Sequence, residues 1–235
     1  MSRNLRQILT GQESEPQTLL ASSVLVIGLG RFGSSLAETL VELGTEVMAI
    51  DLDATLVQEW STRLTHVREA DATNPKVLRQ LGATEFDVAV VAIGTGIEAS
   101  ILTTAALADV GVKNIWAKAI RDDHGSILER VGANHVIYPE KQMGIRVAHA
   151  VSGQVIDYFQ LDEGFVLAEV RPPAELIGLS LRDAHIREKY GVTIVCVKPE
   201  GMGFTYATPE TEIQAGDILV IAGEVAETEK FAALP

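Results

Sequence analysis

Short apolar runs alternate with amphipathic stretches between Ser23 and Pro139 of this chain. Each run is apolar at consecutive positions, which is typical of strands whose two faces are both covered by helices. The pattern therefore predicts an α/β domain with a parallel, doubly wound sheet. The predicted strands are residues 24–27, 47–50, 88–93, 115–118 and 136–137. The predicted helices are residues 33–43, 54–64, 75–81, 98–110 and 125–131.

The pattern changes after Pro139. Residues 140–153 read as one helix in which Met143, Val147 and Val151 recur every four positions. Apolar residues lie on more than one of its faces, which suits packing against another subunit; an ordinary core helix is the alternative. From about Leu161 the runs are shorter and richer in β-branched residues, which predicts a small α+β domain. Residues 199–203 are predicted to form a hairpin, and residues 182–190 and 226–233 are predicted to be helices.

These patterns predict two domains, which is also the usual expectation for 235 residues. We expect a flexible segment over residues 1–21 and a Rossmann-like domain over residues 22–139. A crossover or linker helix over residues 140–160 then leads to the C-terminal domain, residues 161–235.

Composition and charge exclude several classes of function. The chain is 47% hydrophobic and 22% charged, as in soluble globular proteins. No apolar run approaches the roughly 20 residues that cross a bilayer, and residues 1–16 lack a signal peptide's apolar core. We therefore expect a cytoplasmic protein without direct membrane insertion.

The net charge of -13 and the lack of basic clusters argue against nucleic-acid binding. Cys196 is the only cysteine, which excludes internal disulfides.

A glycine-rich loop carries the binding chemistry. It follows the first predicted strand directly and opens a helix, as in nucleotide-binding βαβ units. Asp51 ends the second strand, where an acid can accept hydrogen bonds from ribose hydroxyls. The sequence therefore predicts an adenine-nucleotide site; the alternative is that the glycines only shape a turn. The loop residues are Gly28, Leu29, Gly30, Arg31, Phe32 and Gly33.

Other candidate residues lie at the same edge of the predicted sheet. Arg31 could reach a terminal phosphate of ATP or ADP, although a solvated arginine on a first helical turn is the alternative. Two further groups are expected at the carboxyl ends of strands, where ligands bind in open parallel sheets. We expect them to surround the adenine and ribose. They are Asp71, Ala72 and Thr73, and Ile93 and Gly94.

Six stretches together resemble successive landmarks of the RCK (regulator of K⁺ conductance) proteins of the KtrA/TrkA family, most of all the KtrA type. The resemblance covers about residues 22–235. Its most discriminating parts are the Trp-Ala-Lys strand and the Pro-Glu-Lys-x-Met-Gly junction. The stretches are 26–33 (VIGLGRFG), 70–73 (ADAT), 91–94 (VAIG), 99–104 (ASILTT), 114–118 (NIWAK) and 137–144 (IYPEKQMG).

The resemblance implies roles for single residues. Arg31 would meet the terminal phosphate of ATP, Asp51 the ribose, and Lys118 the phosphates or a neighbouring subunit. Glu140 would face a dimer axis and bind Na⁺, Mg²⁺ or Ca²⁺, which removes the repulsion between carboxylate and triphosphate. The alternative for Glu140 is an acid that stabilises a first helical turn without any ligand.

The C-terminal domain of the resembling proteins forms dimers and can bind cyclic di-AMP at their interface. Arg187, Ile194 and Pro209 are the corresponding cleft residues in this chain. Arg182 stands where the resembling proteins have an apolar residue, and this difference favours a purely structural role for these positions.

The resemblance implies a regulatory, gating subunit of a Ktr-type potassium uptake system. Such a subunit binds ATP or ADP, forms dimers within an octameric ring, and acts at the inner face of the membrane on a KtrB-type transporter subunit. An NAD(H)-binding TrkA-type regulator is the alternative, followed by a small NAD-dependent oxidoreductase. We do not expect this chain to be an enzyme, because it has no Tyr-x-x-x-Lys pair, HExxH motif or P-loop lysine.

Overall fold

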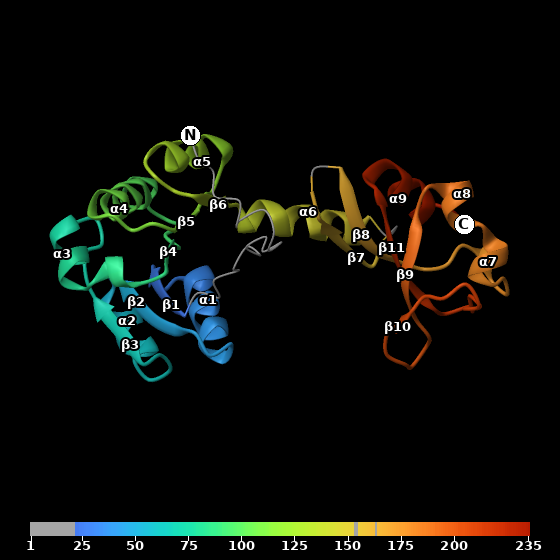
Figure 1. Ribbon diagram of the computed structural model, residues 1–235, viewed down its shortest axis with the longest axis horizontal. Helices are drawn as coiled ribbons and strands as arrows, with labels where there is room; N and C mark the ends of the chain where they lie inside the picture. The colour runs from blue at the N-terminus through green and yellow to red at the C-terminus, as the bar shows by residue number, and fades with distance from the viewer. Residues whose placement is uncertain (1–21, 153–154, 163) are drawn as a thin grey trace, which may run out of the picture. The chain divides into compact units, whose positions relative to one another are not determined.

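The structure is a computed structural model that describes residues 22–152, 155–162 and 164–235. The predicted flexible segment, residues 1–21, lies outside the described residues. The chain divides into two compact units after Pro139, and each has its own sheet (Figure 1).

The first unit holds a six-stranded parallel sheet in the order β3-β2-β1-β4-β5-β6. This order confirms the predicted doubly wound sheet. The strand order reverses between β1 and β4, and ligands of such folds bind at the carboxyl ends of the strands beside that point. The strands are β1 (Ser23–Ile27), β2 (Glu46–Asp51), β3 (His66–Glu69), β4 (Val88–Val91), β5 (Ile115–Lys118) and β6 (His135–Ile137).

Helices cover both faces of this sheet (Figure 1). Val24 and Val26 of β1 pack in the core cluster beneath α1 and α2, whereas Leu25 and Ile27 pack in the cluster beneath α3, α4 and α5. Successive side chains of a strand point to opposite faces, so a two-sided sheet requires the continuous apolar runs of the sequence. The helices are α1 (Arg31–Glu42), α2 (Ala54–Trp60), α3 (Pro75–Gln80), η1 (Ala83–Glu85), α4 (Ile97–Val110) and α5 (Asp122–Arg130).

The second unit contains the predicted small α+β domain, but it begins at Glu140. Residues 157–160, expected to belong to the linker helix, form a strand that pairs with the next one. Its five strands are antiparallel and lie in the order β10-β9-β11-β8-β7. The expected hairpin around residues 199–203 joins β9 to β10. The strands are β7 (Asp157–Gln160), β8 (Phe165–Val170), β9 (Thr193–Lys198), β10 (Thr205–Tyr206) and β11 (Ile218–Glu224).

The helices of the second unit correct one expectation from the sequence. Residues 182–190 read as a single helix, but the structure divides them at His185, whose φ of 49° is left-handed and ends a right-handed helix. The elements of this unit that pack beside the sheet are η2 (Ala174–Leu176), α7 (Leu181–Ala184), α8 (Ile186–Tyr190) and α9 (Val225–Ala232).

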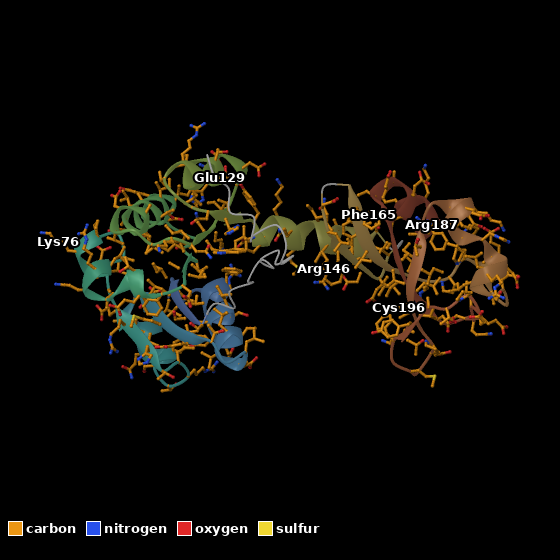
Figure 2. The ribbon with its side chains drawn as sticks, viewed as in Figure 1. Lys76, Glu129, Arg146, Phe165, Arg187 and Cys196 are labelled. Atoms are coloured by element: carbon orange, nitrogen blue, oxygen red, sulfur yellow. The ribbon has the colours of Figure 1, made fainter. Side chains whose placement is uncertain are left out.

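Helix α6 (Pro139–Val151) is joined to β7 through Arg146, labelled in Figure 2. Its guanidinium donates to both carboxylate oxygens of Asp157, at 2.6 and 2.5 Å, and lies 4.2 Å from the ring centroid of Phe159. These hydrogen bonds lower the pKa of Asp157. The stripe of Met143, Val147 and Val151 on the same helix is 49–78% exposed.

Among the described residues, no helix combines the length and the apolar character that crossing a membrane requires.

Candidate functional site

The glycine loop between β1 and α1 is built on two positions that exclude a side chain. Gly28 has a left-handed φ of 101°, and its N–H donates to the carbonyl of Ile50 at 2.8 Å. A Cβ atom on Gly33 would lie 1.8 Å from the carbonyl oxygen of Gly28 and 2.9 Å from the Cβ of Ala92. Both glycines are therefore required by the close approach of the loop, α1 and the chain after β4.

Gly30 is different, because a Cβ there would meet no heavy atom within 4 Å. Gly30 is the N-cap of α1, and its carbonyl accepts from the N–H of Ser34 at 2.9 Å, but it has no side chain to cap the first turn. The first N–H groups of a helix have no partners within it, and the helix dipole favours an anion there. The space above Gly30 therefore suits a phosphate.

Asp51 ends β2 beside this loop. Its Oδ2 accepts from the N–H of Leu29 at 2.6 Å, and its Oδ1 accepts from the N–H of Asp53 at 2.9 Å. Leu29 is 1% exposed, so it offers its backbone rather than its side chain to the site. Each carboxylate oxygen keeps a further acceptor position, so a ribose hydroxyl can still bind.

The structure also brings Lys118 together with two other predicted residues. Lys118 ends β5 and is only 6% exposed. Its Nζ lies 5.7 Å from the ring centroid of Phe32, and a Cβ on Gly94 would lie 3.0 Å from that Nζ. A cation is thus held at the carboxyl edge between the first turn of α1 and the chain after β4. Arg31 begins α1 and is exposed.

The residues after β3 and β4 occupy the expected edge of the sheet. The Oδ1 of Asp71 accepts from the N–H of Thr73 at 3.0 Å and from its hydroxyl at 2.6 Å, while Ala72 is 6% exposed. These bonds form a local turn after the strand. Ile93 lies against the glycine loop, since a Cβ on Gly28 would come within 3.3 Å of its nitrogen.

Glu140 is exposed in the first turn of α6, in the second unit. Over residues 22–152, 155–162 and 164–235, no three His, Cys, Asp or Glu side chains gather where they could hold a metal ion. A cation bound by Glu140 together with a second copy stays a prediction.

The second unit contains a pocket of about 320 Å³. Arg187, Ile194 and Pro209, the three cleft residues expected from the sequence, line it together; Figure 2 labels Arg187. Arg182 also lines the pocket and forms an ion pair with Glu210.

Sequence reasoning missed two features of the site. Ala92 closes the back of the glycine loop, where its atoms approach Gly28 and Gly33, and the sequence carries no signal for this contact. The second feature is the hydrogen bond from Leu29 to Asp51. The position of this acid at the end of β2 predicts a ribose acceptor, but its bond to the loop depends on the packing of β1 beside β2.

The reversal between β1 and β4, the glycine loop and the acid after β2 give the first unit the architecture of a Rossmann-class nucleotide-binding domain. Family models agree with this class: residues 24–139 match the TrkA-N domain and residues 165–235 match the TrkA-C domain. Over 208 residues the chain is 43% identical to the Ktr system potassium uptake protein C of Bacillus subtilis, covering 88% of this chain and 94% of that protein.

The chain is also 38% identical over 207 residues to the Ktr system potassium uptake protein A of the same organism, covering 88% of this chain and 93% of that protein. The chain belongs to this family of potassium uptake proteins, which is a family of transport proteins and not of enzymes. A solved structure of the GsuK channel bound to NAD shares the fold, with a TM-score of 0.64 and 17% identity; the match covers 98% of this chain and 43% of the channel chain.

Proposed function

We propose that this chain is the regulatory subunit of a Ktr-type potassium uptake system, and that it binds ATP and ADP at the glycine loop. The observation that carries the proposal is the open space above Gly30, at a helix start without a side-chain cap, with Asp51 and Lys118 at the same edge of the sheet. The similarity to two potassium uptake proteins of Bacillus subtilis supports the biological role.

ATP and ADP must stabilise different conformations of the subunit, because a ligand with equal affinity for two states shifts nothing. The two ligands differ only in the γ-phosphate. Arg31 is exposed at the first turn of α1 and can extend toward a terminal phosphate there. ATP then gains a charge-assisted contact that ADP lacks.

A second copy of the chain completes the proposed regulator. The exposed stripe of Met143, Val147 and Val151 on α6 offers an apolar surface to such a copy. Glu140 lies at the start of the same helix, and in the proposal a Na⁺, Mg²⁺ or Ca²⁺ ion links it to the triphosphate bound by the second copy. Dimers of this kind form an octameric ring in the proposal.

The proposed partner is a membrane subunit of the KtrB type that carries K⁺. The regulator lies in the cytoplasm and reaches the inner face of the membrane through that partner. The net charge of -13 supports this arrangement, since it disfavours direct contact with anionic lipid.

NAD(H) is the second candidate ligand, favoured by the fold shared with the GsuK channel, whose solved structure holds NAD. The Asp51 carboxylate suits the adenosine ribose of NAD(H) as well as that of ATP. The two candidates differ at one position: ATP has a terminal phosphate that Arg31 can contact, whereas NAD(H) has no terminal phosphate.

Cyclic di-AMP is a further candidate, at the pocket of the second unit. Arg187 offers a cation, while Ile194 and Pro209 offer apolar surface to a base. At about 320 Å³ the pocket is small for a whole cyclic dinucleotide, so a second copy would have to supply the rest of the site. Arg182 also lines the pocket, and its ion pair with Glu210 competes with contact to an anionic ligand.

Thermal unfolding of the nucleotide-stripped protein tests the proposal. ATP, ADP and NADH are compared, each with and without Mg²⁺, because a ligand that binds the folded state raises the melting temperature. We expect larger increases with ATP and ADP than with NADH. A dominant increase with NADH would favour the TrkA-type regulator, and no increase with any of the three would overturn nucleotide binding.

A further inference from the structure

Asp51 connects three segments at the carboxyl edge of the first sheet. Its Oδ2 accepts from Leu29 in the glycine loop, and its Oδ1 accepts from Asp53 at the start of α2. Its backbone carbonyl accepts from the N–H of Ala70, after β3, at 3.0 Å. One residue therefore holds the segments that follow β1, β2 and β3.

The two side-chain bonds require a carboxylate. An ionised aspartate is an acceptor at both oxygens, so it can satisfy two backbone N–H groups at once. Asparagine has the same shape but only one acceptor, and its NH₂ group would face one of these two N–H donors. Hydrogen bonds to a charged acceptor are also stronger than those between neutral groups.

The bond to Leu29 acts directly on the phosphate cradle. Leu29 lies between Gly28, which makes the tight turn, and Gly30, which leaves the space for a ligand. The N–H of Gly28 is already fixed to the carbonyl of Ile50. The carboxylate of Asp51 fixes the next N–H along the chain, so the two successive peptide groups on either side of Gly28 are both oriented by β2.

We infer that Asp51 is a positioning residue for the glycine loop: it holds the loop in the phosphate-binding conformation before any nucleotide arrives. Contact with a ribose is then the second of its two tasks. The effect on ligand affinity rests on the proposed nucleotide function, whereas the effect on the loop does not.

The first test separates the two tasks by calorimetry with ADP and 2′,3′-dideoxy-ADP, which lacks both ribose hydroxyls. Asp51→Asn is compared with the wild type. Asp53→Asn is the matched control, because Asp53 caps α2 by accepting from Thr55 at 2.8 Å and asparagine caps equally well. We expect Asp51→Asn to weaken dideoxy-ADP binding by roughly tenfold, the value of one charge-assisted hydrogen bond, and Asp53→Asn to leave it unchanged. Equal affinity of the wild type and Asp51→Asn for dideoxy-ADP would overturn the inference.

The second test needs no ligand. Hydrogen exchange of the Leu29 amide is measured in the nucleotide-free protein, with the amide of Ala92, which donates to Ile27 at 2.7 Å, as the internal reference. In the wild type both amides should be protected. In Asp51→Asn only Leu29 should exchange faster, by roughly tenfold or more.

An unprotected Leu29 amide in the wild type would overturn the inference even if Asp51→Asn does not fold. If ADP fails to bind the wild type while Leu29 is protected and loses that protection in Asp51→Asn, the proposed nucleotide function fails and the positioning role stands.

Discussion

The contrast between Gly33 and Gly30 gives the sharpest test of the site, because the same substitution should have opposite consequences at the two positions. In Gly33→Ala the new Cβ would lie 1.8 Å from the Gly28 carbonyl oxygen. That atom belongs to the backbone of a loop fixed by β2, so α1 must move away from the sheet. Overpacking of this kind costs typically 1–3 kcal/mol, and a clash with fixed backbone should reach about 3 kcal/mol.

Gly30→Ala should leave the fold intact. Its φ of -65° and ψ of -177° are extended and suit alanine, and nothing lies within 4 Å of the new Cβ. Alanine is a poorer N-cap than glycine, so the expected cost is below about 1 kcal/mol. The methyl group does, however, occupy the space that a phosphate would enter, and we expect nucleotide affinity to fall by about tenfold or more.

The assay is thermal unfolding with and without ATP. At about 3 °C per kcal/mol for a chain of this length, Gly33→Ala should lower the melting temperature by about 9 °C and Gly30→Ala by less than about 3 °C. A ligand at 100 times its Kd stabilises the wild type by about 2.7 kcal/mol, and tenfold weaker binding reduces this to about 1.4 kcal/mol. The ATP-induced increase should therefore be about halved in Gly30→Ala.

Two results would refute this reasoning. An unchanged melting temperature in Gly33→Ala would mean that the loop and α1 are not in close contact. A full ATP-induced increase in Gly30→Ala would mean that the ligand does not approach the backbone at this position.

Three further predictions concern single residues. Arg31→Ala should weaken ATP binding roughly tenfold and ADP binding little, because only ATP offers the γ-phosphate; equal losses in calorimetry would contradict this role. Glu140→Gln should remove the additional melting-temperature increase that Na⁺ or Mg²⁺ gives the ATP complex, and an unchanged increase would count against the cation site. Burial lowers the pKa of His124, which is 2% exposed and accepts a bond from Ile120 at Nδ1. The folded state thus favours neutral His124, and stability should fall as the pH drops below about 6.5.

The control for the last prediction is His124→Asn, whose side-chain oxygen can still accept from the Ile120 N–H. The other four histidines are the same in both proteins, so their titration cancels in the comparison. Between pH 7 and pH 5.5 the melting temperature of the wild type should fall more than that of His124→Asn. Parallel curves would show that His124 does not titrate with folding.

The sequence by itself determined the doubly wound sheet, because a strand buried on both faces must be apolar at consecutive positions, as β1 is. It also determined the glycine loop and the acid after β2, since these are local spacings along the chain. Element ends were less accurate. Helix α5 begins at Asp122 rather than residue 125, and its first turn carries Asp122 and Asp123, acids that interact favourably with a helix start.

Only the tertiary structure decided what each candidate residue does. The fingerprint already gives the glycines of the loop different tasks, but only the structure identifies the contacting atoms: a side chain on Gly33 would meet the Gly28 carbonyl, whereas Gly30 faces open space. Lys118 meets Phe32, 86 positions away by residue number, because β5 and α1 converge at the carboxyl edge. Asp51 binds the loop because β1 pairs with β2. The pattern of apolar residues indicates which faces of a segment are buried. These contacts depend instead on which segments the fold places side by side.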